Sequence, residues 1–300
     1  MPDESSVPPP DDRQDGQSVP PPGLVLVSTP IGNLGDMTTR ARDTLREADL
    51  ILCEDTRHTA RLLSAIGVST RTQPLHEHNE DARIPAILAM LRAGKRIALV
   101  SDAGTPLVSD PGYRLVRAAI AEDLPISAVP GANAAVTALI LSGLPPLPFL
   151  FLGFPPPRSA ARRAAFGGLR AAERAGLAAT LIWHEAPHRL AETLADMLAA
   201  FGDRQAAVAR ELTKHYEEVR RGTVGSLATH YATHPPRGEI TLLLGPPEQA
   251  DHEDLDGQLK QALAGNSVKD AAALVSAATG LPRKLVYARA LELARAADEA

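Results

Sequence analysis

The feature that most constrains the fold is a regular alternation of short apolar runs with helical segments. Runs rich in Val, Ile and Leu at residues 24–28, 50–53, 96–100 and 126–129, with a weaker one at 72–75, predict strands, the first of them typical of burial on both sheet faces. Helices are predicted between them, at residues 38–48, 59–66, 82–93 and 112–121. This order predicts a mostly parallel α/β sheet with its ligand site at the carboxyl ends of the strands.

A second α/β unit is predicted after residue 148. Residues 149–157 resemble the connection between the domains. Beyond them, strands are expected at residues 179–183, 205–210 and 239–244, and helices at 159–175 and 189–200. The acidic run at residues 251–256 indicates a linker, and helices follow at 259–264, 268–279 and 283–296. The Gly-Leu-Pro turn between the last two resembles that of a helix-turn-helix, although any αα-hairpin would look alike. We therefore predict a disordered acidic, Pro-rich tail (1–22), an N-terminal α/β domain (23–148), a C-terminal α/β domain (149–247) and a linker with a helical unit (248–300).

Composition excludes several classes of protein. A single cysteine, Cys53, rules out an intramolecular disulfide framework and a multi-cysteine zinc site. The tail at residues 1–22 accounts for −4 of the net charge of −5, so the total charge says little about an anionic partner. Residues 124–157 carry no charge, but their many prolines exclude one membrane helix, and we expect a buried strand, a turn, a helix and a strand instead. The tail lacks the apolar core of a secretory signal, so we expect a cytoplasmic protein without membrane contact.

Three loops at predicted strand ends are the strongest candidates for a ligand site. No G-x-G occurs among the 22 glycines, and a P-loop, a G-x-S-x-G and an H-E-x-x-H are also missing. The alternate histidines in His76-Glu77-His78 are a weak metal pattern, so no metal is expected. The loops at residues 28–33, 101–112 and 130–133 are rich in small residues and Pro, which fix a tight backbone and let a ligand come close. Such loops can hold a nucleoside-like ligand through backbone groups.

Six motifs in order give these loops a more specific meaning. They are S-T-P-I-G-N-L, C-E-D-T-R-H-T, S-D-A-G-T-P-L-V-S-D-P-G, P-G-A-N-A, H-E-A-P-H-R and A-R-E-L-T-K. Together they resemble the ribosomal RNA small subunit methyltransferase I family, of the tetrapyrrole (class III) methylase superfamily. The resemblance implies S-adenosylmethionine (SAM) in a cleft between two α/β domains, 2′-O-methylation of a cytidine in the decoding centre of 16S rRNA within the 30S subunit, and a homodimer. Asn133 and the pair Trp183-His184 depart from the residues usual in the family.

The resemblance and the loops together predict the residues that bind SAM. They are Thr29, Pro30, Gly32, Asp102, Ala103, Gly104, Thr105, Asp110, Gly131, Ala132 and Asn133, with His184 and Ala209 added by analogy with the superfamily. Asp102 ends a strand, where a carboxylate can meet a ribose or the methionine amine, or only cap the turn. Asp110 precedes Pro111 and a helix, so capping of that helix is as plausible as a ligand contact.

Removal of the hydroxyl proton is the acid–base task of the predicted reaction. A ribose hydroxyl is a weak acid, so a base or a nearby cation is useful. Polar residues at the ends of three predicted strands are candidates, namely Glu54, Asp55 and Arg57, then Glu185, His188 and Arg189, and then Arg210, Glu211 and Lys214. We favour the last group for the acceptor side, because its three charges closely follow an apolar strand. A salt-bridge network is the alternative for this cluster, and the sequence assigns no catalytic base.

Two segments carry a local excess of arginine and lysine. Residues 158–174 hold five Arg against one Glu, and residues 258–295 hold six basic residues against two acidic ones. Such clusters favour RNA phosphates, although a solvated helix face is the simpler explanation of either one. Two other functions remain open at this stage: methylation of a tetrapyrrole, and a non-catalytic RNA-binding assembly factor.

Overall fold

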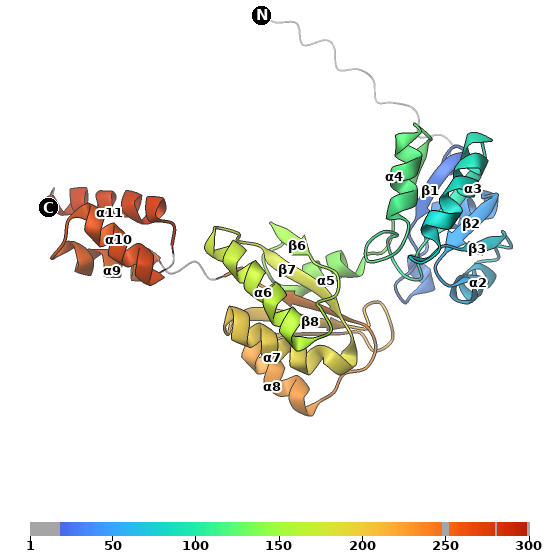
Figure 1. Ribbon diagram of the computed structural model, residues 1–300. Helices are drawn as coiled ribbons and strands as arrows, with labels where there is room; N and C mark the ends of the chain where they lie inside the picture. Colours follow the sequence, from blue (N-terminus) through green and yellow to red (C-terminus); the bar gives the residue numbers. More distant parts are fainter. Residues whose placement is uncertain (1–18, 248–251, 280, 299–300) are drawn as a thin grey trace, which may run out of the picture. The chain divides into compact units, whose positions relative to one another are not determined.

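The computed structural model describes residues 19–247, 252–279 and 281–298, and divides into two compact units, Met1–Ala134 and Ala135–Ala300 (Figure 1). The division falls after the first residue of helix α5 (Ala134–Ser142), whereas the sequence suggests a boundary after residue 148. The four predicted segment limits therefore stay predictions. Most of the predicted tail (1–18) and part of the predicted linker (248–251) lie outside the described residues.

The first unit contains the fully parallel sheet that the strand–helix alternation predicts. Its order is β3-β2-β4-β1-β5. The strands are β1 (Gly23–Val27), β2 (Leu50–Cys53), β3 (Thr72–Pro74), β4 (Arg96–Val100) and β5 (Ile126–Val129). Strand β5 lies at the sheet edge, and of its residues only Val129 is buried, so the expectation of a buried strand was wrong here.

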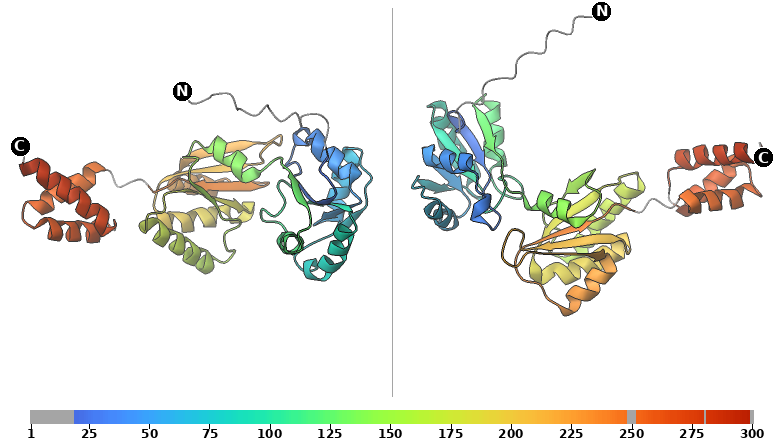
Figure 2. Two further views of the ribbon diagram at one scale, coloured as in Figure 1. Left: turned by 90° about the horizontal axis from the view of Figure 1, so that it is seen from above. Right: turned by 180° about the vertical axis from the view of Figure 1, so that it is seen from behind.

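Helices cover both faces of this sheet (Figure 2). Successive side chains of a strand point to opposite faces, and Leu24 and Val25 of β1 accordingly belong to two different apolar clusters. One cluster includes residues of α1 (Thr39–Glu47) and α2 (Thr56–Ala65), and the other includes residues of α3 (Glu80–Arg92) and α4 (Tyr113–Ala121). Burial on both faces explains why the inner strands are continuous apolar runs.

The second unit contains a mixed sheet in the order β6-β7-β10-β8-β9. Its strands are β6 (Phe149–Phe151), β7 (Thr180–Glu185), β8 (Gln205–Arg210), β9 (Glu218–Thr223) and β10 (Ile240–Leu244). Only β6 and β7 pair in parallel; the other neighbours are antiparallel. Strand β9 and helix α8 (Val224–Thr233) were not predicted, because β9 is a half-buried edge strand with two Arg and one Glu and has no apolar run.

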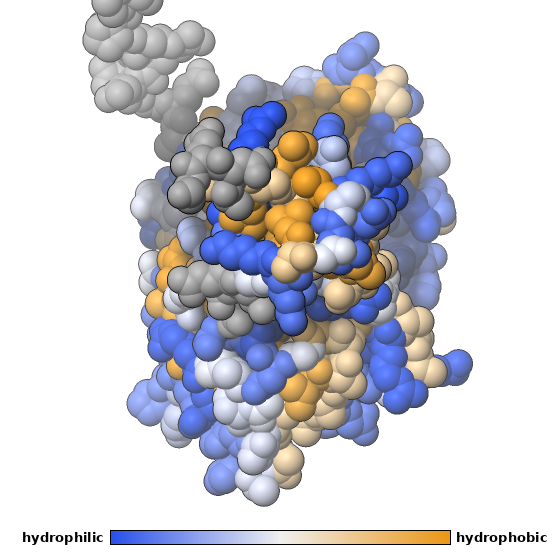
Figure 3. All heavy atoms as spheres, turned by 90° about the vertical axis from the view of Figure 1, so that its left-hand side faces the viewer, coloured by the Kyte–Doolittle hydropathy of each residue, from blue (hydrophilic) through white to orange (hydrophobic). Residues whose placement is uncertain are grey.

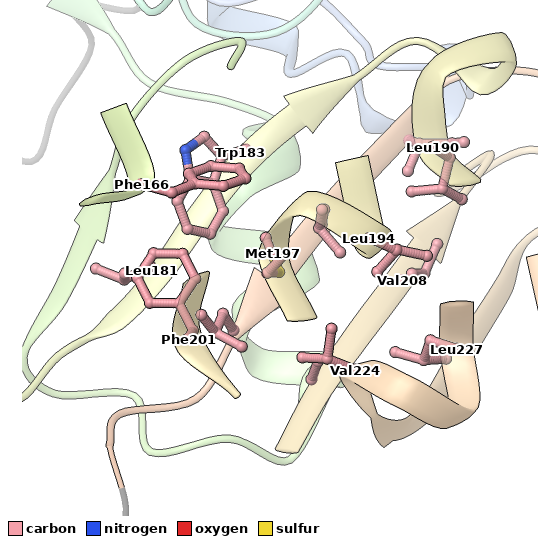
Figure 4. Packing of buried hydrophobic residues seen from close by; sticks show 14 of the residues in the cluster. Phe166, Leu181, Trp183, Leu190, Leu194, Met197, Phe201, Val208, Val224 and Leu227 are labelled. Carbon is pink, nitrogen blue, oxygen red and sulfur yellow. The ribbon is translucent and has the colours of Figure 1, made fainter. Parts of the chain in front are cut away.

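Aromatic and aliphatic side chains fill the space between this sheet and three helices, α6 (Ser159–Arg174), α7 (Leu190–Phe201) and α8 (Figure 4). Phe166 lies at the centre of this core, with its ring centroid 5.6 Å from that of Trp183 and 5.4 Å from that of Phe201. Aromatic rings attract one another at these separations. Both the ring–ring contacts and the burial of apolar surface therefore hold α6 against the sheet.

The helical unit has a small apolar core of its own, formed by residues such as Leu259, Val275 and Val286. Its helices are α9 (His252–Leu263), α10 (Val268–Thr279) and α11 (Arg283–Asp298). The linker predicted at residues 251–256 was therefore wrong, because α9 already begins at His252. Acidic residues suit a helix N-terminus, and Asp256 also accepts hydrogen bonds from Arg289 of α11 at 2.6 and 2.8 Å.

One ion pair in the second unit allows a direct test of its packing. The Arg162 side chain is fully buried, and its Nε donates to Asp196 Oδ2 at 2.8 Å, which joins α6 to α7. Arg162→Ala should cost about 3–5 kcal/mol, because it leaves the Asp196 carboxylate buried without its cation. Arg162→Met with Asp196→Leu should cost clearly less, since neither charge then remains. Urea unfolding followed by the fluorescence of Trp183, the only tryptophan, measures both, with exposed Arg163→Ala as control. Equal losses in the single and double variants would contradict this.

Candidate functional site

The three loops predicted from the sequence follow β1, β4 and β5, which are adjacent strands of the parallel sheet. The loops therefore meet at one edge of the sheet, as expected. Of the predicted site residues, the first unit contributes Thr29, Pro30, Gly32, Asp102, Ala103, Gly104, Thr105, Asp110, Gly131, Ala132 and Asn133. The second unit contributes His184, Ala209, Arg210, Glu211 and Lys214.

Hydrogen bonds fix the three loops to one another. The Thr29 N–H donates to the Gly104 carbonyl at 2.9 Å, and the Gly104 N–H donates back to the Thr29 carbonyl at 3.1 Å. The Thr105 hydroxyl donates to the Ala132 carbonyl at 3.1 Å, which ties the β4 loop to the β5 loop. Because the loops are bonded to one another, their free backbone groups form a single rigid surface.

Two glycines make this close approach possible. Gly104 has φ 82°, a conformation that L side chains rarely adopt, and a Cβ there would lie 3.1 Å from Ile31 Cγ2. A Cβ on Gly131 would lie 2.9 Å from Ser28 Cβ, closer than side chains normally come. Larger residues at either position would push the loops apart.

Asp102 connects this surface to the neighbouring strand β2. Its Oδ1 accepts a hydrogen bond from the Asp55 N–H at 3.2 Å, and Asp55 in turn caps α2 by accepting from the Arg57 N–H. The second carboxylate oxygen of Asp102 is not used in this bond, so a ligand amine or hydroxyl can still meet it. Turn capping and ligand contact are compatible for this residue.

Asp110 lies in the second half of the β4 loop and lines a cavity of about 410 Å³. Burial, followed by the charges of Glu54 and Asp102, raises its pKa from 3.8 to about 7. It does not cap α4, because the N-cap residue is Gly112 and no side chain makes a capping bond there. Leu107 and Ser109 in the same loop have φ values of 72° and 73°, which cost L residues about 1–3 kcal/mol each.

His184 and Ala209 lie on opposite sides of β10 in the second unit, level with each other along the sheet. Both are register partners of Thr241, one from β7 and the other from β8. His184 Nδ1 lies 3.3 Å from Thr241 Oγ1, and burial lowers the pKa of this histidine, which favours the neutral ring. The ring also contacts Phe151 and Phe154, at centroid distances of 4.9 and 5.6 Å.

Arg210, Glu211 and Lys214, at and after the end of β8, are held in two sets of ion pairs. Arg210 Nη2 lies 2.9 Å from Glu218, and Lys214 Nζ lies 2.9 Å from Glu211 and 3.2 Å from Glu239. The Glu239 N–H and then Lys214 lower the pKa of Glu211, so it is a poor base. Glu211 also has φ 51°, an uncommon conformation for a residue with a side chain. The geometry suits cation placement rather than proton removal.

The motif H-E-A-P-H-R has a largely structural explanation. The Glu185 carboxylate is 2% exposed and accepts hydrogen bonds from the Ala186 N–H, Arg189 Nε and Thr193 Oγ1. Arg189 Nη2 also donates to the Pro155 carbonyl at 3.0 Å. These bonds fix the 3-10 turn Pro187–Arg189 to the chain around Pro155.

Both basic segments carry fewer free positive charges than their sequences suggest. Arg162 is fully buried against Asp196, and Arg289 is paired with Asp256 and Glu292, so neither contributes a free positive charge. Lys269, Arg283 and Lys284 are exposed and have no ion pair among the residues that the structure describes.

Figure 3 shows hydrophobic side chains between hydrophilic ones on the face turned to the viewer. In the helical unit, Leu274, Leu285 and Tyr287 are 56%, 50% and 40% exposed.

The described residues show neither a metal-binding cluster nor a membrane-spanning helix. His76 and His78 have ring centroids 6.1 Å apart, and no group of three or more His, Cys, Asp or Glu able to hold a metal occurs in the described part of the chain. Among the described helices, none combines the length and apolarity needed to cross a bilayer.

What sequence reasoning missed is the cavity beside Asp110. Glu54, Glu77 and Glu80 line it with Ser109–Arg114, and they come from the ends of β2, β3 and β4. The available signal was the acidic residue directly after β2 and the pair of glutamates after β3. These carboxyl groups lie around one cavity because the strand order places β2 between β3 and β4, and a local sequence pattern does not contain that order.

Comparisons with known proteins agree with this architecture. A family model described as tetrapyrrole (corrin/porphyrin) methylases matches residues 23–228, and one described as the RsmI C-terminal HTH domain matches residues 249–294. Among solved structures, diphthine synthase has a TM-score of 0.56 at 15% identity, covering 74% of this chain and 89% of that one. A cobalt precorrin-4 methyltransferase has a TM-score of 0.53 at 18% identity, covering 76% and 95%. At such identities these structures show the fold alone.

Curated relatives are much closer in sequence. Ribosomal RNA small subunit methyltransferase I of Mesorhizobium japonicum is 46% identical over 276 residues, which cover 91% of this chain and 92% of that protein. Its counterpart from Micromonospora olivasterospora is 47% identical over 272 residues, covering 88% and 85%. The chain belongs to the ribosomal RNA small subunit methyltransferase I family of tetrapyrrole methylases, and it is a SAM-dependent methyltransferase.

Proposed function

We propose that this enzyme transfers a methyl group to the ribose 2′-hydroxyl of a cytidine in the decoding centre of 16S rRNA. It acts as a homodimer on the 30S subunit in the cytoplasm. The names of the relatives support an rRNA of the small subunit as substrate. The observation that carries the proposal is the rigid surface formed by the three bonded loops, which suits a nucleoside-containing methyl donor without a G-x-G motif.

We expect the loops to bind SAM through both backbone groups and one carboxylate. Thr29 and Gly104 use their backbone groups on each other, so they maintain the shape of the site. The Asp102 carboxylate, together with the backbone around Ala103 and Gly131, would meet the ligand. When bound, SAM supplies an electrophilic methyl group on a sulfonium. His184 and Ala209 remain predicted contributors from the second unit.

The charged cluster of the second unit would serve the RNA. Ion pairs with carboxylates hold the Arg210 and Lys214 side chains in position. Because they are already positioned, these cations can bind a phosphate without a large side-chain rearrangement. Glu211 would hold Lys214 in position rather than accept a proton. Lys269, Arg283 and Lys284 of the helical unit offer a further positive surface for RNA phosphates.

The loop assignment predicts the behaviour of two variants. Asp102→Ala and Gly104→Val should each weaken SAM binding at least about tenfold, or about 1.4 kcal/mol, in calorimetry. Gly94→Val is a matched control, because Gly94 has φ 76° at the other end of β4 and no atom lies within 4 Å of a Cβ there. Wild-type SAM affinity in both site variants would remove the assignment.

The charged cluster is tested through the reaction rate. Arg210→Ala, Glu211→Ala and Lys214→Ala should each lower the methylation rate at least about tenfold, while SAM affinity changes little. The matched control is Lys95→Ala, because Lys95 pairs with Asp49 at 3.0 Å in the first unit. Variants that methylate normally would show that the network only stabilises the fold.

The helical unit is tested through RNA affinity. Reversing the charge of Lys269, Arg283 and Lys284 together should weaken 30S binding, most strongly at low salt. The slope of log affinity against log salt concentration should become shallower by about two. Truncation after Gly245 should have a similar effect and leave SAM binding intact. Exchanging Lys and Arg at the same three positions keeps the charge and is the control. Unchanged 30S affinity in both the reversed and the truncated protein would rule out this role.

A further inference from the structure

A cavity of about 410 Å³ lies at the carboxyl ends of β2, β3 and β4. It is lined by Glu54, Glu77, Glu80 and the segment Ser109–Arg114. Its volume falls within the range of small-molecule sites, about 300–1,000 Å³, and is large enough for a nucleoside. The cavity belongs entirely to the first unit, so its shape follows from the parallel sheet and the loops after it.

The β4 loop joins this cavity to the predicted SAM surface. Residues 102–105, at the beginning of the loop, bond to Thr29 and Ala132, whereas residues 109–112, at its end, line the cavity. Because β4 stands between β2 and β1 in the sheet, the two regions adjoin along the same edge. The inference therefore rests on the proposed function, which places SAM on the β1, β4 and β5 side.

The charge of the lining limits what the cavity can accept. Four carboxyl groups face one arginine, Arg114, whose Nη1 is paired with Asp81 at 2.6 Å. One of the four, Glu80, is used structurally, because its Oε1 accepts from the Leu115 N–H at 2.9 Å. Such a lining repels phosphates and attracts hydrogen-bond donors, such as ribose hydroxyls and the amino group of cytosine. A nucleoside part of an RNA, with its phosphates outside, fits this chemistry.

Asp110 has no structural task that explains its position. It does not cap α4, and its carboxylate makes no hydrogen bond or ion pair with any of the residues described by the structure. The flanking Ser109 is held at positive φ, which costs free energy and fixes the loop at the cavity wall. A carboxylate kept without a partner at a cavity wall is available to a substrate.

We propose that this cavity holds the acceptor nucleoside and that the Asp110 carboxylate, in place of the SAM contact expected from the sequence, accepts the proton of its ribose hydroxyl during methyl transfer. The hydroxyl oxygen forms a bond to the methyl carbon while the bond from that carbon to sulfur breaks. The electron pair of the broken bond remains on sulfur, and the product is S-adenosylhomocysteine. The proton moves to Asp110 and then to solvent, so no further reactant is needed.

The protonation of Asp110 suits this role. Burial, then Glu54 and Asp102, raise its pKa to about 7, near the pH at which a general base is most effective. The other ionisable groups around the cavity are Glu77 from the turn before α3, Glu80 at the start of α3, and Tyr113 and Arg114 from α4. Burial and then the charge of Asp102 raise the pKa of Glu54, and the nearby His76 opposes this rise. Glu54 is thus the neighbour whose removal should shift the titration of Asp110 most.

Kinetics with SAM and 30S subunits test the proposal. Asp110→Asn should lower the methylation rate at least about a hundredfold and leave SAM affinity within about twofold. The wild-type rate should rise with pH to a plateau with a midpoint near 7, and Glu54→Gln should move this midpoint to lower pH. Asp123→Asn is the control, because Asp123 is an exposed carboxylate just after α4 that does not line the cavity.

A second readout needs neither SAM nor RNA. Between about pH 4 and 7 the native protein keeps a proton on Asp110 that the unfolded chain releases, so this group's contribution to stability falls as pH rises. Asp110→Asn cannot ionise, and its melting temperature relative to wild type should therefore be higher at pH 8 than at pH 5. When both proteins also carry Glu54→Gln, which should lower the pKa of Asp110, this difference between pH 8 and pH 5 should be smaller.

Three outcomes would overturn the proposal while the proposed function stands. They are an Asp110→Asn enzyme as fast as wild type, a loss of SAM affinity of tenfold or more in that variant, and a relative stability that does not change with pH. A wild-type enzyme that binds SAM but labels no rRNA would instead refute the proposed function itself.

Discussion

The reciprocal backbone pair between Thr29 and Gly104 is the interaction on which the candidate site depends. It continues the pairing of β1 and β4 beyond the sheet, in the antiparallel sense, and so turns two ordinary strand ends into one bonded surface. The pair requires Gly104 at φ 82°, and the β5 loop then joins through Thr105 and Ala132. A glycine conformation thus determines how three separate loops are arranged.

The β4 loop has two halves with different surroundings. Its first half is rich in small residues and is fixed by hydrogen bonds to neighbouring loops, whereas its second half carries Asp110 to a cavity lined by carboxyl groups. Burial and like charge raise the pKa of Asp110 to about 7, which is costly for stability above that pH. Such a cost is common at functional sites, where strained or unpaired groups are kept for chemistry.

The sequence allowed the parallel sheet and the placement of the three loops to be predicted, because strands buried on both faces leave continuous apolar runs and end in small residues. It did not allow the prediction of β9, an edge strand whose charged side chains pair with neighbours such as Arg210. Nor could it separate exposed from buried arginines: Arg162 has the same local sequence signal as Arg163, but only Arg162 faces Asp196. The cavity beside Asp110 required the strand order, which no local pattern contains.

The central claim is that this enzyme methylates a ribose hydroxyl of small-subunit rRNA. The most direct test is incubation with tritiated SAM and 30S subunits that lack the modification, followed by nuclease digestion and mapping of the label. The account predicts one labelled methyl group on the ribose of a single cytidine in 16S rRNA. Label on a base, or no transfer to any rRNA by an enzyme that binds SAM, would contradict it.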